Sequence, residues 1–219
     1  MNPQLDPDRA LALAYVPASR RAAVEALWRL DAAFAAVLAG GREPLAQQLR
    51  LAWWREALER LDVAPPPPEP VLTGAANRLL PAGVAGAELA AMETGWAELL
   101  VPGRLPADAL DAYAAGRGGL LFRLSARLLG GGEARAAAGG EAWALADLAR
   151  RSADPADAAA ALAAARARDP GGVWPVPLRP LGMLAALAAR DAARAPERLE
   201  RPGAPARLLR MARHRLTGR

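Results

Sequence analysis

The chain has 219 residues, enough for one domain with a substantial buried core. It contains no cysteine, which excludes disulfides, zinc–thiolate sites and thiol catalysis. The formal net charge is +5, and the charged basic residues are all arginine because the sequence has no lysine. Alanine makes up roughly a quarter of the residues and favours helix, since it loses no side-chain entropy there.

The first predicted elements are two helices separated by glycines. Periodic apolar residues begin after Ser19, a candidate N-cap, and stop at Gly40-Gly41. The next helix opens at Glu43-Pro44 and runs to about residue 62. Because its apolar residues lie on two stripes, we expect this helix to be central and largely buried. The stripes are Leu45, Leu49 and Trp53 on one side, and Leu51, Trp54, Leu58 and Leu61 on the other.

A proline-rich connector follows at 64–70, and we expect it to lie inside a single domain spanning 1–219 because neither flank has an obvious core of its own. Further helices are predicted along the rest of the chain, separated by proline and glycine. No stretch shows the alternation typical of a strand, so the predicted fold class is all-α. The predicted helices cover 71–80, 86–100, 106–129, 141–152, 155–168 and 180–194, with a turn at Asp169–Gly172 and a basic C-terminal helix at 203–216.

Side chains that could carry catalysis are scarce. The single histidine, His214, falls in the last predicted turn, where we expect it to be exposed and to interact with helix-end carbonyls. No phosphate-binding loop of the GxxxxGK type occurs. A helix-borne magnesium site needs two carboxylates four residues apart, and no Asp or Glu is followed by another at that spacing. The residues therefore predict no catalytic group, no metal ligand and no cofactor.

The segment Leu49–Leu58, LRLAWWREAL, is the most distinctive in the chain. It is similar to the RLxWWRDAL helix of the squalene/phytoene synthase superfamily, the all-α head-to-head prenyl transferases. The order of the other segments agrees with this resemblance. Tyr113–Leu121 resembles the family's YxxxxAGxV helix, and Gly140–Arg151 resembles its second-motif helix, GxAxQLTNILRD. The resemblance covers residues 15–217.

This resemblance implies an isoprenoid-synthase-like helical bundle around a central apolar cavity. It also implies that the family's carboxylates, which hold the magnesium ions that bind two diphosphates, are absent. The chain is thus closer to the divergent branch that includes a mitochondrial complex I assembly factor. The positions where the motif residues would fall are Ala35, Ala36 and Ala39 in the first motif, and Ala144, Ala146, Asp147 and Arg151 in the second.

Candidate binding residues on these helices are arginines, which suit a diphosphate, and aromatic rings, which suit an apolar chain. A separate expectation concerns Asp31, which falls on the apolar stripe of its helix, where a lone carboxylate would be costly. We predict that Asp31 is buried with an arginine partner, Arg50 or Arg123. The candidate binding residues are Arg50, Trp53, Trp54, Arg55, Phe122, Arg123, Trp143, Asp147 and Arg150.

Three functions remain open at this level. The first is a non-catalytic protein of this fold that binds a prenyl diphosphate or another isoprenoid ligand, or acts in assembly. The second is an active prenyl transferase of squalene, phytoene or carotenoid biosynthesis. The third is a peripheral membrane or protein-binding domain that uses the arginine-rich segment Arg194–Arg219. No secretion signal or spanning segment is recognisable, so we expect a cytoplasmic protein, peripheral to the inner membrane in the third case, with no nucleic-acid partner.

Overall fold

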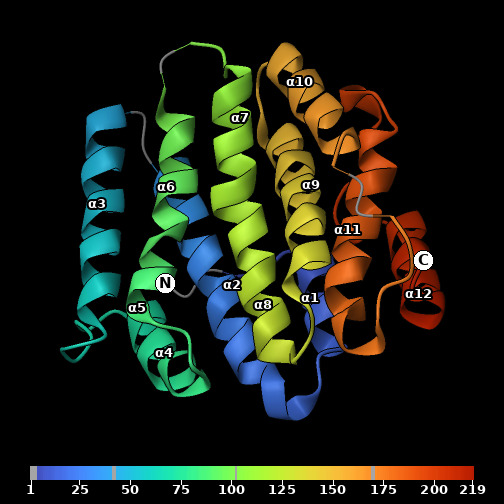
Figure 1. Cartoon of the computed structure of the whole chain (residues 1–219). Helices are drawn as coiled ribbons and strands as arrows, with labels where there is room; N and C mark the ends of the chain where they lie inside the picture. Colours follow the sequence, from blue (N-terminus) through green and yellow to red (C-terminus); the bar gives the residue numbers. More distant parts are fainter. Residues whose placement is uncertain (1–3, 41–42, 102, 169–170) are drawn as a thin grey trace.

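The structure is a computed structural model of the chain. It describes residues 4–40, 43–101, 103–168 and 171–219, and these form helices joined by turns, with no strand among them (Figure 1). The all-α prediction is confirmed. The α-helices are α1 Pro7–Ala14, α2 Ala18–Ala39, α3 Pro44–Arg60, α4 Pro70–Arg78, α5 Gly86–Ala90, α6 Met92–Ala97, α7 Ala107–Tyr113, α8 Leu120–Leu129, α9 Glu133–Arg151, α10 Pro155–Arg166, α11 Arg179–Ala192 and α12 Pro205–Thr217.

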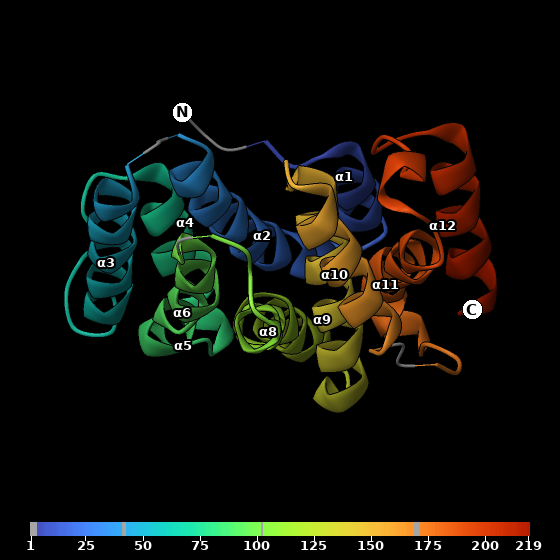
Figure 2. The same cartoon turned by 90° about the horizontal axis from the view of Figure 1, so that it is seen from above.

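The helices form a bundle with α3 at one edge and α12 at the opposite edge, as Figure 1 and the view from above in Figure 2 both show. Between these edges, α9 packs against α8, α10 and α11, and α2 packs against α4 and α8. At the edges, α3 packs on α5 and α12 packs on α11. The middle of the bundle is therefore built from α2, α8 and α9.

Short-range signals determine where several helices begin. The Asp6 carboxylate accepts hydrogen bonds from the backbone N–H groups of Asp8 and Arg9 and so caps α1. Asp154 caps α10 in a similar way, through the N–H of Ala156. The helix α1 is not predicted from the sequence, because its eight residues are too few to show a helical period.

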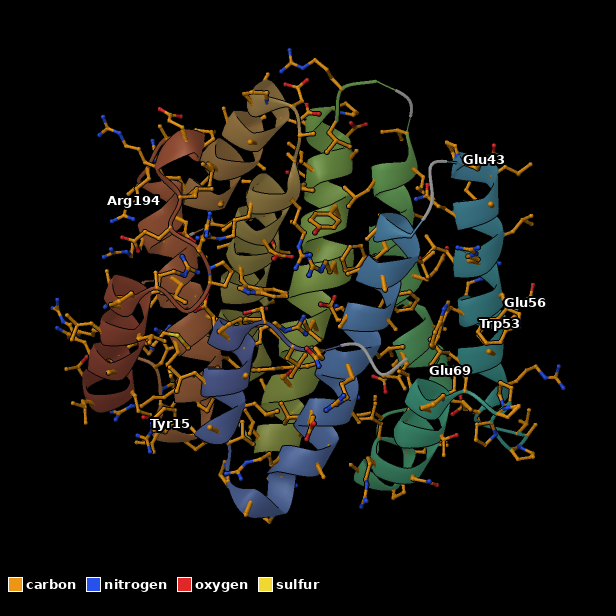
Figure 3. All side chains as sticks on the ribbon, turned by 180° about the vertical axis from the view of Figure 1, so that it is seen from behind. Tyr15, Glu43, Trp53, Glu56, Glu69 and Arg194 are labelled. Carbon is orange, nitrogen blue, oxygen red and sulfur yellow. The ribbon has the colours of Figure 1, made fainter. Side chains whose placement is uncertain are left out.

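The expectation that α3 is a central helix is wrong, because α3 forms an edge of the bundle. One of its apolar stripes, which includes Leu51 and Leu58, is buried against the neighbouring helices. The other stripe, formed by Leu45, Leu49 and Trp53, is exposed, and Figure 3 shows Trp53 at the outer side of the molecule. In α3, therefore, one apolar stripe packs against the bundle and the other faces solvent.

The predicted helix at 106–129 is present as α7 and α8, which are continuous through a π-helical turn at Ala114–Gly119. α9 crosses this turn at two glycines. A Cβ on Gly118 would lie 2.1 Å from the carbonyl oxygen of Gly140, and a Cβ on Gly140 would lie 2.1 Å from that of Gly118. Only residues without a Cβ permit this approach. Gly140 serves this crossing, and the preceding Gly139 leaves room for the Trp174 ring. Because neither glycine breaks the helix, α9 begins at Glu133, earlier than predicted.

Large side chains fill the space between α2, α8 and α9. Trp28 is buried, and its indole N–H donates to Ser125 Oγ at 3.0 Å, while the Ser125 hydroxyl donates to the Leu121 carbonyl at 2.7 Å. Phe122 and Trp143 stack with their ring centroids 5.6 Å apart. These rings pack between the three helices and contribute to the spacing between them.

α12 is held against α1 and α11 by Arg207, which bonds Asp8 Oδ2 at 2.8 Å and Asp191 Oδ1 at 2.8 Å. His214 lies on the same face of α12 and is buried, with its ring in edge contact with Trp174 at a centroid distance of 6.3 Å. The expectation of an exposed terminal histidine is therefore wrong. The reason is that the face of α12 that carries His214 packs on α11.

The connector at 64–70 joins α3 to α4. Gly41 and the Asp169-Pro170 part of the predicted turn lie outside the described residues. Within the described ranges, no helix combines the length and the hydropathy that crossing a membrane requires.

Candidate functional site

Asp31 on α2 carries a fully buried carboxylate at the centre of the bundle. Arg117 bonds it twice, with Nε donating to Oδ1 at 2.9 Å and Nη2 donating to Oδ2 at 3.1 Å. Arg9 adds a third bond, from Nη1 to Oδ2 at 3.0 Å. The predicted burial beside an arginine is confirmed, but the predicted partners Arg50 and Arg123 are wrong, since both are exposed. The true partners come from α1 and from the π-helical turn.

Arg117 is 1% exposed and joins four helices around one guanidinium. Its Nη1 lies 2.8 Å from Asp147 Oδ2 on α9, and the same nitrogen donates to the Tyr113 hydroxyl. Its guanidinium carbon lies 4.1 Å from the centroid of the Trp96 ring and 4.7 Å from that of Trp143. The cation is thus neutralised by carboxylates and stacked between aromatic faces.

We name Arg9, Asp31, Tyr113, Arg117 and Asp147 the buried charge cluster. Burial alone would raise the pKa of Asp31 and of Asp147, but the neighbouring arginines outweigh it and hold both pKa values below the ordinary 3.8. Burial would lower the pKa of Arg117, and its carboxylate partners raise it instead. Burial raises the pKa of the Tyr113 hydroxyl. At neutral pH the cluster therefore holds two carboxylates, two guanidinium ions and a neutral phenol, with no net charge.

A pocket of about 280 Å³ lies beside the cluster, between α2, α6, α7 and α9. Its lining is mainly apolar, with the guanidinium of Arg151 and the hydroxyl of Ser152 as polar groups. The Trp96 indole N–H is buried and has no acceptor within the described part of the chain. The buried rings of Trp28 and Phe122 lie nearer the centre of the bundle. The lining residues are Ala35, Leu38, Ala39, Trp96, Leu99, Tyr113, Leu148, Arg151 and Ser152.

The arginine of this pocket is tied to the cluster. Arg151 Nε donates to both oxygens of Asp147 at 3.1 Å, so the Asp147 carboxylate lies between two guanidinium ions, those of Arg117 and Arg151. Ala35 and Ala39, which also line the pocket, bring no ionisable group to it. The pocket therefore has a cationic side and an apolar side, which is the chemistry that suits an amphiphile with an anionic end.

The predicted binding residues on α3 lie away from the cluster. Arg50, Trp53 and Arg55 are exposed at the edge of the bundle. Trp54 points inward and makes an edge contact with Phe34, with ring centroids 5.9 Å apart. None of these side chains lines the pocket beside Arg117.

The predicted binding residues on α8 and α9 lie closer to the buried charge cluster. Trp143 and Asp147 contact Arg117, and Phe122 stacks on Trp143. Arg150 points to the other side of α9, where it bonds the Asp191 carboxylate. Arg123 faces outward on α8. Of the five predicted residues on these two helices, Phe122, Trp143 and Asp147 thus lie together near Arg117, and Arg123 and Arg150 do not.

Sequence reasoning missed Arg9, Trp96, Tyr113 and Arg117. A usable signal existed for Arg117, because an arginine with glycine on both sides in a helical segment suggests close packing of the backbone around a buried side chain. Its spacing of four residues from Tyr113 places the two side chains on one helix face. Arg9 gave no such signal, since it lies in the short α1.

The helical bundle with a buried charge cluster at its centre defines an all-α protein. A family model described as squalene/phytoene synthase matches residues 3–160, and the chain belongs to that family. No curated protein and no solved structure matches the chain.

The magnesium ions that this family uses do not fit the residues present. Magnesium takes oxygen ligands, mainly from carboxylates and water. The first-motif positions are Ala35, Ala36 and Ala39, and the one carboxylate on the second-motif helix near the pocket, Asp147, is already bonded by two arginines. Among the described residues, no three His, Cys, Asp or Glu side chains gather to form a metal site.

Proposed function

We propose that this member of the squalene/phytoene synthase family is non-catalytic and binds an isoprenoid-type ligand with an anionic end group. The observation that carries the proposal is the pairing of Asp147 with Arg117 and Arg151. At the site where the family concentrates carboxylates around metal ions, this chain places guanidinium ions. Such a site attracts a phosphate group but lacks the metal that would stabilise a departing diphosphate.

The pocket beside Arg151 supports the choice of ligand. Leu38, Leu99 and Leu148 give it an apolar wall, and its volume of about 280 Å³ is near the lower end of the range for small-molecule sites. The buried Trp96 N–H, unpaired in the described structure, supplies a donor that a ligand oxygen could accept from. A role in assembly stays a prediction of the resemblance alone.

A turnover assay tests the first half of the proposal. The pure protein is incubated with farnesyl or geranylgeranyl diphosphate and magnesium, and released pyrophosphate and C30 or C40 products are measured. We expect neither above the level of a buffer blank. Magnesium-dependent formation of either product would show an active transferase and overturn the proposal.

A binding titration tests the second half. Farnesyl diphosphate is titrated into the protein by calorimetry with magnesium and with EDTA, and we expect the same affinity in both. Ala39→Phe, which fills the pocket, should abolish binding, whereas Ala36→Phe on the exposed side of the same helix should not. Arg151→Gln should weaken farnesyl diphosphate about tenfold, the loss of one charge-assisted hydrogen bond, and leave farnesol unaffected. Equal binding by the two phenylalanine variants would place the ligand elsewhere and contradict the assignment of this pocket.

A further inference from the structure

The outer side of α12 carries apolar side chains that nothing in the described part of the chain covers. Leu209 and Leu216 are 72% and 77% exposed, and they lie two helical turns apart on the same side of α12. The opposite side carries Met211 and His214, which are buried against the bundle. The leucines therefore do not belong to the core, and they form a row that points into solvent.

Arginines flank this row. Arg213 lies one turn after Leu209 on the same side of α12, and Arg215 lies at the edge of that side, next to Leu216 in the sequence. Neither arginine forms an ion pair with a carboxylate of the described residues. The segment 201–219 contains no Asp or Glu at all. Burial lowers the pKa of the nearby Arg210, and the charges of Arg213 and Arg190 lower it further, which shows how closely the cations gather. The surface around the leucine row is thus strongly positive.

An aromatic ring extends the same surface. Tyr15, in the turn between α1 and α2, is 42% exposed, and its ring centroid lies 5.4 Å from the guanidinium carbon of Arg215. Figure 3 shows Tyr15 on the same side of the molecule as the red-brown helix α12. Tyrosine combines an apolar ring with a polar hydroxyl, a combination that suits the boundary between hydrocarbon and water.

We propose that this surface, which we call the α12 face (Tyr15, Leu209, Arg213, Arg215 and Leu216), docks on a bilayer that contains anionic lipid. The leucines and the tyrosine ring would enter the boundary between headgroups and acyl chains, and the arginines would contact lipid phosphates. Charge favours lipid over a second copy of the chain, because two α12 faces brought together would oppose arginine to arginine. The property is separate from ligand binding in the pocket beside Arg151.

The chain also offers a matched control surface. Leu45 and Leu49 on α3 are 67% and 64% exposed and lie one turn apart at the opposite edge of the bundle. Their surroundings differ from those of the α12 leucines, because carboxylates lie on this side of the molecule. Figure 3 shows Glu43 at the start of α3 and Glu56 farther along it. Exposed leucine is therefore common to both edges, but the charge around it differs. Residues 43–60 carry three glutamates and three arginines, whereas residues 201–219 carry arginine and no carboxylate side chain.

Vesicle co-sedimentation of the full chain tests the proposal. Vesicles of phosphatidylcholine are compared with vesicles that also contain phosphatidylglycerol, at low and at high salt. We expect binding to the anionic vesicles only, and weaker binding as salt rises. Leu209→Ser with Leu216→Ser should lower the partition coefficient roughly tenfold or more, as should Arg213→Gln with Arg215→Gln. Leu45→Ser with Leu49→Ser should leave it unchanged.

The substituted leucines and Arg213 are exposed and Arg215 is half-buried, so the variants should fold, and circular dichroism and the melting temperature verify this before binding is compared. Equal loss of binding in the α3 control and the α12 variant would contradict a role of the α12 face. Binding to poly-glutamate without binding to anionic vesicles would assign the surface to an acidic protein instead. A wild-type dimer in light scattering that Leu209→Ser abolishes, without vesicle binding, would assign it to a second copy. Each of these three outcomes overturns the proposal.

Discussion

Asp31 and Arg117 lie 86 residues apart in sequence, yet their side chains share two hydrogen bonds of 2.9 and 3.1 Å at a point with almost no access to solvent. The pair joins α2 to the π-helical turn, and Asp147 extends it to α9. A carboxylate buried this deeply is tolerated only when it is paired and hydrogen-bonded on all sides. In this chain arginine provides that pairing, and the resulting cluster joins the helices that enclose the pocket.

Removing the charge of Asp31 should therefore be costly. Asp31→Asn leaves Arg9 without its carboxylate and Arg117 with only Asp147, and we expect a loss of about 3–5 kcal/mol in the free energy of unfolding. Urea denaturation followed by circular dichroism measures the change.

The matched control for Asp31 is an exposed ion pair. Glu25 and Arg29 form an i,i+4 pair on the surface of the same helix, so Glu25→Gln should cost less than about 0.5 kcal/mol. Similar losses in the two variants would mean that the buried cluster does not hold the helices together.

The glycine contact between the π-helical turn and α9 makes a second prediction. In Gly118→Ala the new Cβ would lie 2.1 Å from the Gly140 carbonyl oxygen, so the two backbones must separate, at a cost of about 3 kcal/mol. Gly74→Ala in α4 meets nothing within 4 Å and should stabilise the protein by about 0.5–1 kcal/mol through helix propensity. Thermal unfolding of the two variants compares them directly, and a neutral Gly118→Ala would contradict the close crossing.

The sequence was sufficient for the fold class and for most helices, because proline, glycine and apolar periodicity mark helix ends and faces locally. It was sufficient for the burial of Asp31 as well, since a carboxylate between Trp28 and Phe34 on one helix stripe has few alternatives. Which arginine pairs with Asp31 depends on how α1, α2 and the π-helical turn cross. Nothing local in the sequence determines that geometry, so Arg50 and Arg123 were the wrong choices.

The same limit explains the other errors. Periodicity shows that α3 has two apolar stripes, but whether Leu45 and Leu49 meet a neighbouring helix depends on the position of α3 in the bundle. Position along the chain suggested an exposed His214, and only the packing of α12 on α11 buries it. The resemblance implied an apolar cavity but not its lining, because the walls of the pocket come from four helices that are distant in sequence.

Buried His214 should make stability depend on pH in the weakly acidic range. Burial and the charges of Arg210 and Arg179 lower its pKa from 6.5 to about 4. The unfolded chain therefore takes up a proton near pH 6.5 that the folded chain refuses until about pH 4, and stability falls across that window. We expect a loss of about 1–2 kcal/mol between pH 7.5 and 5, after allowing for solvent screening.

Replacing His214 with leucine distinguishes the contribution of the histidine to the pH dependence of stability from that of the carboxylates. His214→Leu removes the only histidine of the chain, so its unfolding free energy should fall much less than that of the wild type from pH 7.5 to 5. Burial raises the pKa of Glu93, so this group acts in the opposite direction and adds stability as the pH falls. Asp31 and Asp147 do not contribute to the change between pH 7.5 and 5. Their pKa values are held below the ordinary 3.8, so the stability that they provide is lost only at a lower pH. The same pH dependence in wild type and His214→Leu would show that another group titrates in this window.

The attachment of α12 should depend on Arg207. This side chain bonds Asp8 on α1 and Asp191 on α11 at once, and the Asp8 carboxylate also accepts the Gly203 N–H at 2.9 Å just before α12 begins. Arg207→Met leaves two buried carboxylates without this partner, and we expect a loss of about 3–5 kcal/mol together with local release of α12. Hydrogen exchange followed by mass spectrometry should show faster exchange in 205–217 than in α2. Arg213→Gln, an exposed arginine on the same helix, is the control and should exchange like wild type. If Arg207→Met exchanges faster throughout the chain to the same degree, the arginine stabilises the whole bundle and not α12 in particular.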